Sequence, residues 1–329
     1  MAKKPGEFEL IAQYFAPLSG QGSFNLFDDA ALLTPKPNHS LVITQDAIAQ
    51  DIHFFADDPP YLIAKKALRV NLSDLAAKGA TPISFSLALG LANDWSEEWV
   101  SEFAKGLAQD CEQFNIDLSG GDTFKTNTGF IISITAIGEI PDGHYTSRLG
   151  ASEGDAIFVT GTIGDGALGL LARQGKLKQV ADDYLNYLTD RYLLPLPRTD
   201  FAPLIQEYAS ASMDISDGLV ADLEKLCAAS SVGAEIAIDN IPLSPAAKAV
   251  IELESDYLGR ALTGGDDYEI LFAVPQTKLS AFEEALIKFS IPVSQIGEIT
   301  CEQEVILFDS NGKKINFEKK GYDHSGENS

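Results

Sequence analysis

Aspartate residues in this sequence recur where an apolar stretch gives way to a turn. Asp214 and Asp217 lie in SMDISDGL, directly before a helical pattern, and Asp122 follows two glycines at the end of an expected strand. Asp46 stands where an expected strand gives way to a loop, Asp28 and Asp29 precede an apolar strand, and Asp266 and Asp267 follow another glycine pair. Functional groups are often carried where the strands of a sheet end. Because these groups offer oxygen, and no histidine or cysteine cluster accompanies them, they favour a hard cation such as Mg²⁺.

Each of these aspartates, taken alone, has a simpler explanation, because aspartate caps helices and forms turns beside glycine. Asp74 is harder to explain in this way. It interrupts the apolar helical stretch NLSDLAAKGA one turn after Asn71, where a carboxylate without a partner is costly. Glycine pairs before Asp122 and Asp266 would also let backbone N–H groups approach phosphate oxygens closely. We therefore interpret the aspartates as metal ligands beside bound phosphate.

The charge balance excludes one class of partner. The chain has 48 aspartates and glutamates against 24 lysines and arginines, a formal net charge of −24. Nonspecific binding of nucleic acid requires a basic surface that displaces counterions from phosphates, so we expect no nucleic-acid partner. A phosphorylated substrate would need divalent cations to approach so acidic a protein.

The cysteines and the N-terminal residues indicate a cytoplasmic protein. Cys111, Cys227 and Cys301 form no Cys-x-x-Cys pair, which argues against a zinc site or a disulfide framework, and we expect three buried, reduced thiols. Glu7 and Glu9 interrupt the first apolar stretch, so no signal peptide is predicted. No run of about 18 apolar residues occurs, and we expect no membrane association.

The expected helices and strands indicate two domains, 1–145 and 146–329, because 329 residues are many for a single core. In the first domain we expect helices at 7–15, 59–79 and 95–114 and strands at 41–48, 83–91, 116–124 and 130–140. In the second we expect a strand from 156, helices near 165–173, 183–193, 218–230 and 277–289, and strands near 234–238, 268–274, 293–299, 304–308 and 315–317. Strands and helices do not alternate strictly. We therefore predict an α/β and an α+β domain with mixed sheets rather than one doubly wound sheet.

Two stretches superficially resemble nucleotide-binding loops. GLLARQGK (169–176) has one residue too many between its glycines for a Walker A loop, and Leu177 stands where that loop has Ser or Thr. GTIGDG (161–166) lies between an expected strand and helix, but its glycine spacing differs from that of a dinucleotide-binding loop. We predict a tight turn into a helix at 161–166.

Six segments together resemble the thiamine-monophosphate kinase family: NLSDLAAKGA, SGGDT, VTGTIGDGALGL, MDISDGLVADL, TGGDDYEILF and KGYDH. That family belongs to the superfamily of aminoimidazole-ribonucleotide synthetase and selenophosphate synthetase, and the resemblance extends over essentially the whole chain. It implies a synthetase-like fold, with an N-terminal mixed-sheet domain that dimerises through its sheet. A C-terminal α+β sandwich completes the active-site cleft in that family.

The resemblance also implies roles for individual residues. The implied magnesium ligands are Asp29, Thr44, Gln45, Asp46, Asp74, Asp122, Asp214 and Asp217. The implied ATP-binding residues are Gly121, Asp122, Arg148 and Ser216. The residues implied to contact thiamine phosphate are His53, Asp266 and Tyr322. Arg148 and Asp122 are the implied catalytic residues, and no general base is expected.

The chain departs from the family pattern at two positions. Phe27 precedes the first aspartate pair, where the family usually has glycine, and Gln45 precedes Asp46, where the family usually has threonine. Loss of the glycine would alter how the loop approaches a phosphate. The glutamine still offers a carbonyl oxygen, from its side chain or backbone, to a metal.

The implied reaction transfers the γ-phosphoryl group of ATP, directly and in line, to the phosphate of thiamine monophosphate. That acceptor has a second pKa of about 6, so it is largely deprotonated at neutral pH and needs no general base. Several Mg²⁺ ions would neutralise the two polyanions, and Arg148 would stabilise charge on the transferred group. Tyr322 would stack on the thiamine rings, and Asp266 would face its charged or amino groups.

Two other functions stay open on the sequence alone. One is another ATP-dependent enzyme of the superfamily, similar to aminoimidazole-ribonucleotide synthetase. The other is a catalytically inactive scaffold that binds nucleotide or metal, which the altered first aspartate pair would suit. A selenophosphate synthetase is disfavoured, because the N-terminal region has no reactive cysteine.

Overall fold

The computed structural model describes residues 4–315, 317 and 321, and these divide into two compact units. Unit 1 contains the described residues up to Leu75 together with Ala80–Gly143. Unit 2 contains Ala76–Gly79 and the described residues from His144 onward. Each unit has helices on a mixed sheet, so the predicted fold class is confirmed. Among the described helices, none has the length and apolar character needed to cross a bilayer.

Unit 1 is built on a four-stranded sheet in the order β1-β4-β2-β3. Its strands are β1 (His39–Ala49), β2 (Thr81–Leu91), β3 (Asp117–Lys125) and β4 (Ile131–Pro141). β4 pairs antiparallel with both β1 and β2, whereas β3 runs parallel to β2. β1 and β3 are therefore the two edges of this sheet.

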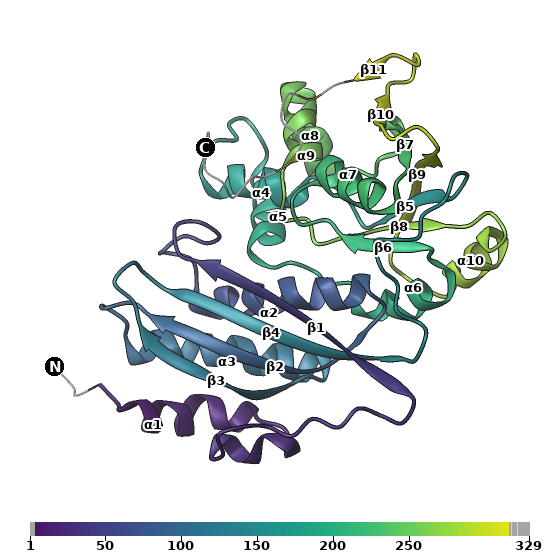
Figure 1. Ribbon diagram of the computed structural model, residues 1–329. Coiled ribbons are helices and arrows are strands. Elements are labelled where there is room, and N and C mark those ends of the chain that lie inside the picture. The colour runs from purple at the N-terminus through teal and green to yellow at the C-terminus, as the bar shows by residue number, and fades with distance from the viewer. Residues whose placement is uncertain (1–3, 316, 318–320, 322–329) are drawn as a thin grey trace. The chain divides into compact units, whose positions relative to one another are not determined.

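Two long helices, α2 (Pro60–Ala77) and α3 (Glu97–Phe114), cover one face of the sheet, as Figure 1 shows. The sequence of β4 explains why α2 and α3 pack on this face. Ile132, Ile134 and Ala136 are buried in the core with both helices, and the polar residues between them point to the other face.

The N-terminal segment runs along the edge strand β3 (Figure 1). Its short helices are α1 (Glu7–Leu10), η1 (Ile11–Phe15), η2 (Ala16–Leu18) and η3 (Gln21–Leu26). Ser23 Oγ donates a hydrogen bond to the Leu118 carbonyl oxygen at 2.9 Å, and Leu10 and Phe15 join the core of unit 1. These contacts hold the segment that leads into Asp28 and Asp29.

Unit 2 is built on a seven-stranded sheet in the order β11-β10-β7-β9-β5-β8-β6. The strands are β5 (Ala156–Thr160), β6 (Ala211–Asp214), β7 (Gly233–Ala237), β8 (Ile270–Val274), β9 (Val293–Thr300), β10 (Val305–Phe308) and β11 (Lys314–Ile315). Only β10 and β7 pair in parallel, and the other neighbours pair antiparallel.

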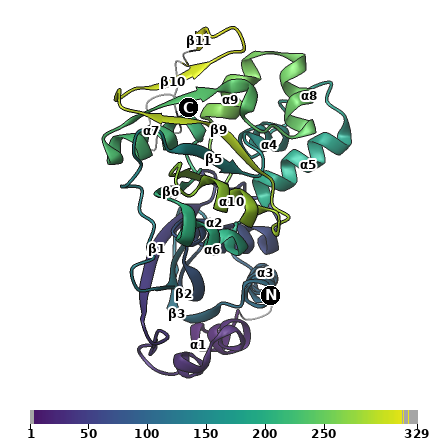
Figure 2. The same ribbon diagram turned by 90° about the vertical axis from the view of Figure 1, so that its right-hand side faces the viewer.

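Helices cover both faces of this second sheet. They are α4 (Asp165–Arg173), α5 (Asp182–Leu193), α6 (Ala202–Tyr208), α7 (Leu219–Ser230), α8 (Pro245–Leu253), α9 (Asp256–Thr263) and α10 (Leu279–Leu286), with short turns η4 (Thr199–Phe201) and η5 (Ile238–Asn240). Along β8, Leu271 packs with α7, whereas Ile270 and Phe272 pack with α6 and α10. Every residue of β8 is buried for this reason. Figure 2 shows α4, α5, α8 and α9 grouped together, where they share a smaller apolar cluster.

Most of the expected elements are present, with shifted ends. The strand β6 and the helices α6, α8 and α9 were not expected, because each is short and lies among turn-forming residues. The prediction of three buried thiols is confirmed for Cys227, but Cys111 is only half-buried, and the prediction is wrong for Cys301, which is exposed directly after β9. Burial raises the pKa of the Cys111 and Cys227 thiols to about 12.

Candidate active site

Thr44, Asp46 and Asp74 come together where β1 lies on α2. Thr44 Oγ1 donates a hydrogen bond to Asp74 Oδ2, and Asp46 N–H donates to Asn71 Oδ1 at 3.0 Å. Asn71 is fully buried and stands one turn before Asp74 on the same helix. The Asp74 carboxylate thus has the polar partner that its position on an apolar helix requires.

The Gln45 side chain points away from this group, because side chains alternate along a strand. Gln45 Nε2 donates to Ser133 Oγ on β4 at 3.1 Å, on the sheet face that α2 does not cover. Three consecutive residues of β1 were predicted to bind metal. The structure places Thr44 and Asp46 together and separates the Gln45 side chain from them.

Asp29 and Asp122 line one cavity of about 390 Å³ in unit 1. The N-terminal segment, β2 and β3 form it, and Asp28 and Gly121 line it too. Gly121 has a φ of +156°, and a Cβ at this position would lie 1.9 Å from the Leu87 carbonyl oxygen. Glycine is therefore required for the close pairing of β3 with β2 that places Asp122 in the cavity.

These two groups of residues occupy opposite edges of the unit 1 sheet. Thr44 and Asp46 are on β1 and Asp122 is on β3, with β4 and β2 between them. At the usual strand spacing the two edges are about 14 Å apart. Throughout the part of the chain that is described, three or more His, Cys, Asp or Glu side chains do not converge in a way that could hold a metal ion. A single copy of unit 1 therefore does not join these predicted ligands into one site.

His53 lies in the turn that follows β1. Ala49 N–H donates to His53 Nδ1 at 3.1 Å, so a neutral imidazole carries its proton on Nε2. The His53 carbonyl oxygen accepts a hydrogen bond from Lys66 Nζ at 3.1 Å. Lys66 is only 2% exposed, so a buried ammonium group fixes the turn that carries the imidazole.

In unit 2, Asp214 ends β6, and the loop that follows carries Ser216 and Asp217. The backbone N–H groups of Ser216, Asp217 and Gly218 donate to one oxygen, Asp222 Oδ2, at 3.0, 2.9 and 3.2 Å. Asp222 is fully buried. Burial raises the pKa of its carboxyl group, although Lys225 and the Asp217 N–H group oppose the change. Asp222 therefore accepts the hydrogen bonds of the backbone N–H groups that precede α7. Asp214 and Asp217 are not needed to cap this helix.

Asp217 and Asp222 share one cation. Lys225 Nζ pairs with Asp222 Oδ1 at 2.8 Å and also with Asp217 Oδ2. The negative charge of the Asp217 carboxylate in this loop is thus balanced by the Lys225 ammonium group.

Asp266 lies beside this loop, joined to it through the backbone. Asp266 N–H donates to the Ser216 carbonyl oxygen at 3.0 Å, and Tyr268 N–H donates to the Ile215 carbonyl oxygen at 2.8 Å. A Cβ on Gly265 would lie 2.2 Å from the Ser216 carbonyl oxygen, so glycine is required there. Residues predicted to bind nucleotide, metal and substrate are therefore adjacent.

Arg148 lies at the other end of β6 from these residues. Ser212 N–H, at the start of the strand, donates to the Ser147 carbonyl oxygen at 3.0 Å, and Arg148 is exposed. About 13 Å of extended chain separates residue 212 from Ser216. Arg148 and Ser216, both predicted to bind ATP, are thus not neighbours in unit 2.

Tyr322, the third predicted substrate residue, lies outside the described residues. The glycine before it, Gly321, packs against the start of α7, where a Cβ would lie 2.3 Å from Ala221 Cβ.

The sequence interpretation missed Asp222, Lys66 and Lys225. A usable signal existed for Asp222, because it interrupts the apolar helical pattern LVADLEKL as Asp74 interrupts its own helix. Nothing in the local pattern distinguishes Lys66 or Lys225 from an ordinary surface lysine.

Known proteins resemble this chain over almost its full length. The models for the N-terminal and C-terminal domains of AIR synthase related protein match residues 27–140 and 152–310. The thiamine-monophosphate kinase of Caulobacter vibrioides is 38% identical over 98% of this chain and 92% of its own. The crystal structure of the kinase from Stenotrophomonas maltophilia K279a matches with a TM-score of 0.79 and 37% identity, over 88% of this chain and 91% of that one. AaThiL complexed with AMPPCP and TMP matches with a TM-score of 0.77 and 33% identity, over 97% of both chains. These matches confirm the resemblance drawn from the motifs: the chain belongs to the thiamine-monophosphate kinase family.

Proposed function

We propose that this protein transfers the γ-phosphoryl group of ATP to thiamine monophosphate and so forms thiamine diphosphate. The observation that carries the proposal is the backbone pairing of the loop containing Ser216 and Asp217 with Asp266, because these residues were predicted to bind nucleotide, metal and substrate. The likeness to AaThiL complexed with AMPPCP and TMP, over 97% of both chains, supports the same assignment.

The residues of unit 1 and unit 2 divide the proposed tasks among them. Gly121, Asp122, Arg148 and Ser216 bind ATP, and His53, Asp266 and Tyr322 bind thiamine monophosphate. His53 Nε2–H suits a phosphate oxygen, because its Nδ1 already accepts a backbone hydrogen bond. Asp266 suits the positively charged part of thiamine. Since the acceptor phosphate is already deprotonated at neutral pH, no side chain has to remove a proton before the in-line transfer.

The side-chain oxygen atoms of the predicted metal ligands fit Mg²⁺, which prefers oxygen ligands. Asp217 already pairs with one cation, the Lys225 ammonium group, which supports its assignment as a cation ligand. We assign Mg²⁺ to Asp29, Thr44, Asp46, Asp74, Asp122, Asp214 and Asp217, with Gln45 contributing only its backbone carbonyl oxygen. Bound there, several Mg²⁺ ions would neutralise the charge of the two phosphate substrates.

We further propose that the protein works as a homodimer. On β1, Leu41 and Ile43 share the sheet face of Gln45, which no described helix of unit 1 covers, and they are 39% and 64% exposed. A second copy on this face would bury them, and would bring a second set of ligands toward edges that lie about 14 Å apart in one copy. The use of ATP agrees with the expected cytoplasmic location.

A coupled assay tests the proposed activity directly. ADP release should depend on both thiamine monophosphate and Mg²⁺, and chromatography should show thiamine diphosphate formed in equal amount. ATP turnover without thiamine diphosphate would favour another enzyme of the superfamily. Nucleotide binding without any turnover would favour the inactive scaffold.

A further inference from the structure

Residues 266–269 have an uncommon backbone conformation. Asp266 and Tyr268 both have positive φ angles, +73° and +53°, a region that residues other than glycine rarely occupy. Such residues persist only where their surroundings hold them, and they gather at functional sites. Two buried carboxylates, Asp267 and Glu269, alternate with these residues and hold the segment.

Asp267 fixes the segment to the start of α4. Its side chain is fully buried, and its two oxygens accept hydrogen bonds from Gly164 N–H at 2.7 Å and Gly166 N–H at 3.0 Å. A Cβ on Gly166 would lie 2.1 Å from the Asp266 carbonyl oxygen. GTIGDG is thus a tight turn into a helix, as predicted, and its glycines let the turn pack against the segment that carries Asp266.

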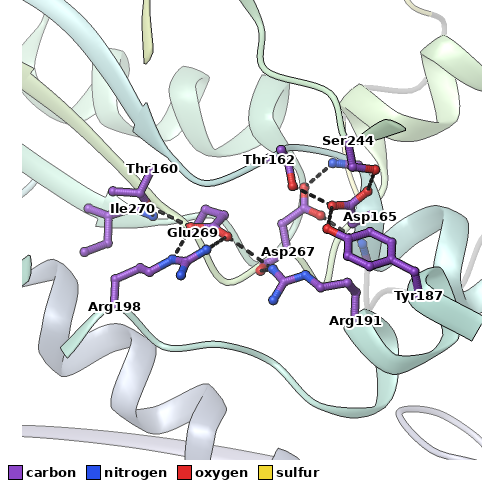
Figure 3. A network of polar contacts seen from close by, with 12 residues as sticks. Thr160, Thr162, Asp165, Tyr187, Arg191, Arg198, Ser244, Asp267, Glu269 and Ile270 are labelled. Carbon is purple, nitrogen blue, oxygen red and sulfur yellow. Dashed lines mark hydrogen bonds and ion pairs between the residues drawn. The ribbon is translucent and has the colours of Figure 1, made fainter. Parts of the chain in front are cut away.

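Glu269 fixes the other side of Tyr268, in the network that Figure 3 shows. This fully buried carboxylate accepts hydrogen bonds from Arg198 Nε at 2.6 Å, from Thr160 Oγ1 at 2.7 Å and from Arg191 at 3.2 Å. Paired and hydrogen-bonded in this way, a buried charge resists displacement, since any movement would leave it without a partner. The backbone of Tyr268 is therefore anchored on both sides.

Held in this conformation, the Tyr268 side chain points back to Asp266. Its hydroxyl group donates to Asp266 Oδ1 at 3.0 Å, and the tyrosine is 9% exposed. The hydrogen bond joins two residues that are only two positions apart, and the positive φ angles of both make it possible.

We propose that Tyr268 is a positioning residue for substrate recognition. Its hydroxyl group orients the Asp266 carboxylate toward the cationic part of thiamine monophosphate, and Asp267 and Glu269 hold the backbone that presents both side chains. This inference rests on the proposed function, which assigns Asp266 to the substrate. It adds that the direction of the carboxylate, and not its charge alone, determines affinity for thiamine.

The test compares Tyr268→Phe, Asp266→Asn and the double variant. Each is measured by the Kd for thiamine monophosphate in titration calorimetry and by the two KM values in the coupled assay. Tyr268→Phe removes one oxygen and keeps the buried ring. We expect Kd and KM for thiamine monophosphate to rise about 10-fold, the lower end for one lost hydrogen bond to a charged group, while KM for ATP stays within twofold. In the Asp266→Asn background, Tyr268→Phe should have no further effect on binding, because the carboxylate that it orients is absent.

Tyr187→Phe is the matched control. Its hydroxyl group belongs to the same region but donates to Asp165 Oδ2 at 3.0 Å, so its loss should leave binding of thiamine monophosphate unchanged. Equal effects of Tyr187→Phe and Tyr268→Phe, or multiplied effects in the double variant, would overturn the positioning role. If Asp266→Asn binds thiamine monophosphate normally, the substrate assignment of Asp266 fails, and the inference fails with it. If the wild-type protein does not bind thiamine monophosphate, the proposed function itself is wrong.

Discussion

Asp222 supports the candidate site without being one of the predicted ligands. One of its oxygens accepts hydrogen bonds from the backbone N–H groups of Ser216, Asp217 and Gly218. The positions of the Ser216 and Asp217 side chains therefore depend on a carboxylate behind the loop, as is common for residues that surround metal sites.

Asp222→Ala should lower the free energy of unfolding by about 3 kcal/mol, because it leaves buried N–H groups without an acceptor. Asp222→Asn, which keeps an acceptor oxygen, should lose less. Urea denaturation measures both, with Glu252→Gln on the exposed surface of α8 as the control. A change below about 0.5 kcal/mol for Asp222→Ala would mean that the loop does not depend on this side chain.

Asp122→Asn tests the metal assignment in unit 1. Losing an electrostatic stabiliser of the transition state commonly lowers kcat by about 100-fold or more, and we expect that loss with an unchanged circular dichroism spectrum. Asp28→Asn is the control, because Asp28 lines the same cavity but is not an assigned ligand. Full activity of Asp122→Asn would remove Asp122 from the site.

For individual strands and loops, close packing of backbone segments determines where the predicted residues lie. The strand expected at 268–274 begins only at Ile270, because Asp266 and Tyr268 adopt positive φ angles. Their residue types do not indicate this. It results from the buried hydrogen bonds that Asp267 and Glu269 make with distant parts of unit 2.

Gly121→Ala should disturb the pairing of β2 with β3, because the added Cβ would lie 1.9 Å from the Leu87 carbonyl oxygen. We expect a loss of about 2 kcal/mol in the free energy of unfolding, together with reduced activity through displaced Asp122. The neighbouring Gly120→Ala is a close control, because nothing lies within 4 Å of a Cβ built there. Equal stability of the two variants would show that β3 shifts without penalty.

At the scale of the whole molecule, one copy of the chain carries its predicted unit 1 ligands on two separate edges of a sheet. The uncovered face between these edges bears exposed apolar side chains on β1, such as Ile43. An exposed apolar strand face of this kind is typical of a surface that another protein covers.

Ile43→Asp should convert the proposed dimer to a monomer and abolish most of the activity. Sedimentation velocity measures the change. Ile287→Asp is the control, because Ile287 is 84% exposed and belongs to unit 2, not to the sheet of unit 1. A wild-type protein that sediments as a monomer at micromolar concentration, with full activity, would contradict the dimer.

The family, the fold class and the types of residue that could bind metal and phosphate could all be predicted from the amino-acid sequence. These depend on residue identity and on spacing within short segments such as MDISDGLVADL and TGGDDYEILF. Three features became visible only in the folded chain: the Gln45 side chain turns away from Asp46, Asp222 accepts hydrogen bonds from the loop of Ser216 and Asp217, and Tyr268 contacts Asp266. The physical reason is that each of these depends on pairing between distant strands or on a buried polar partner elsewhere in the chain, and local patterns do not encode such contacts.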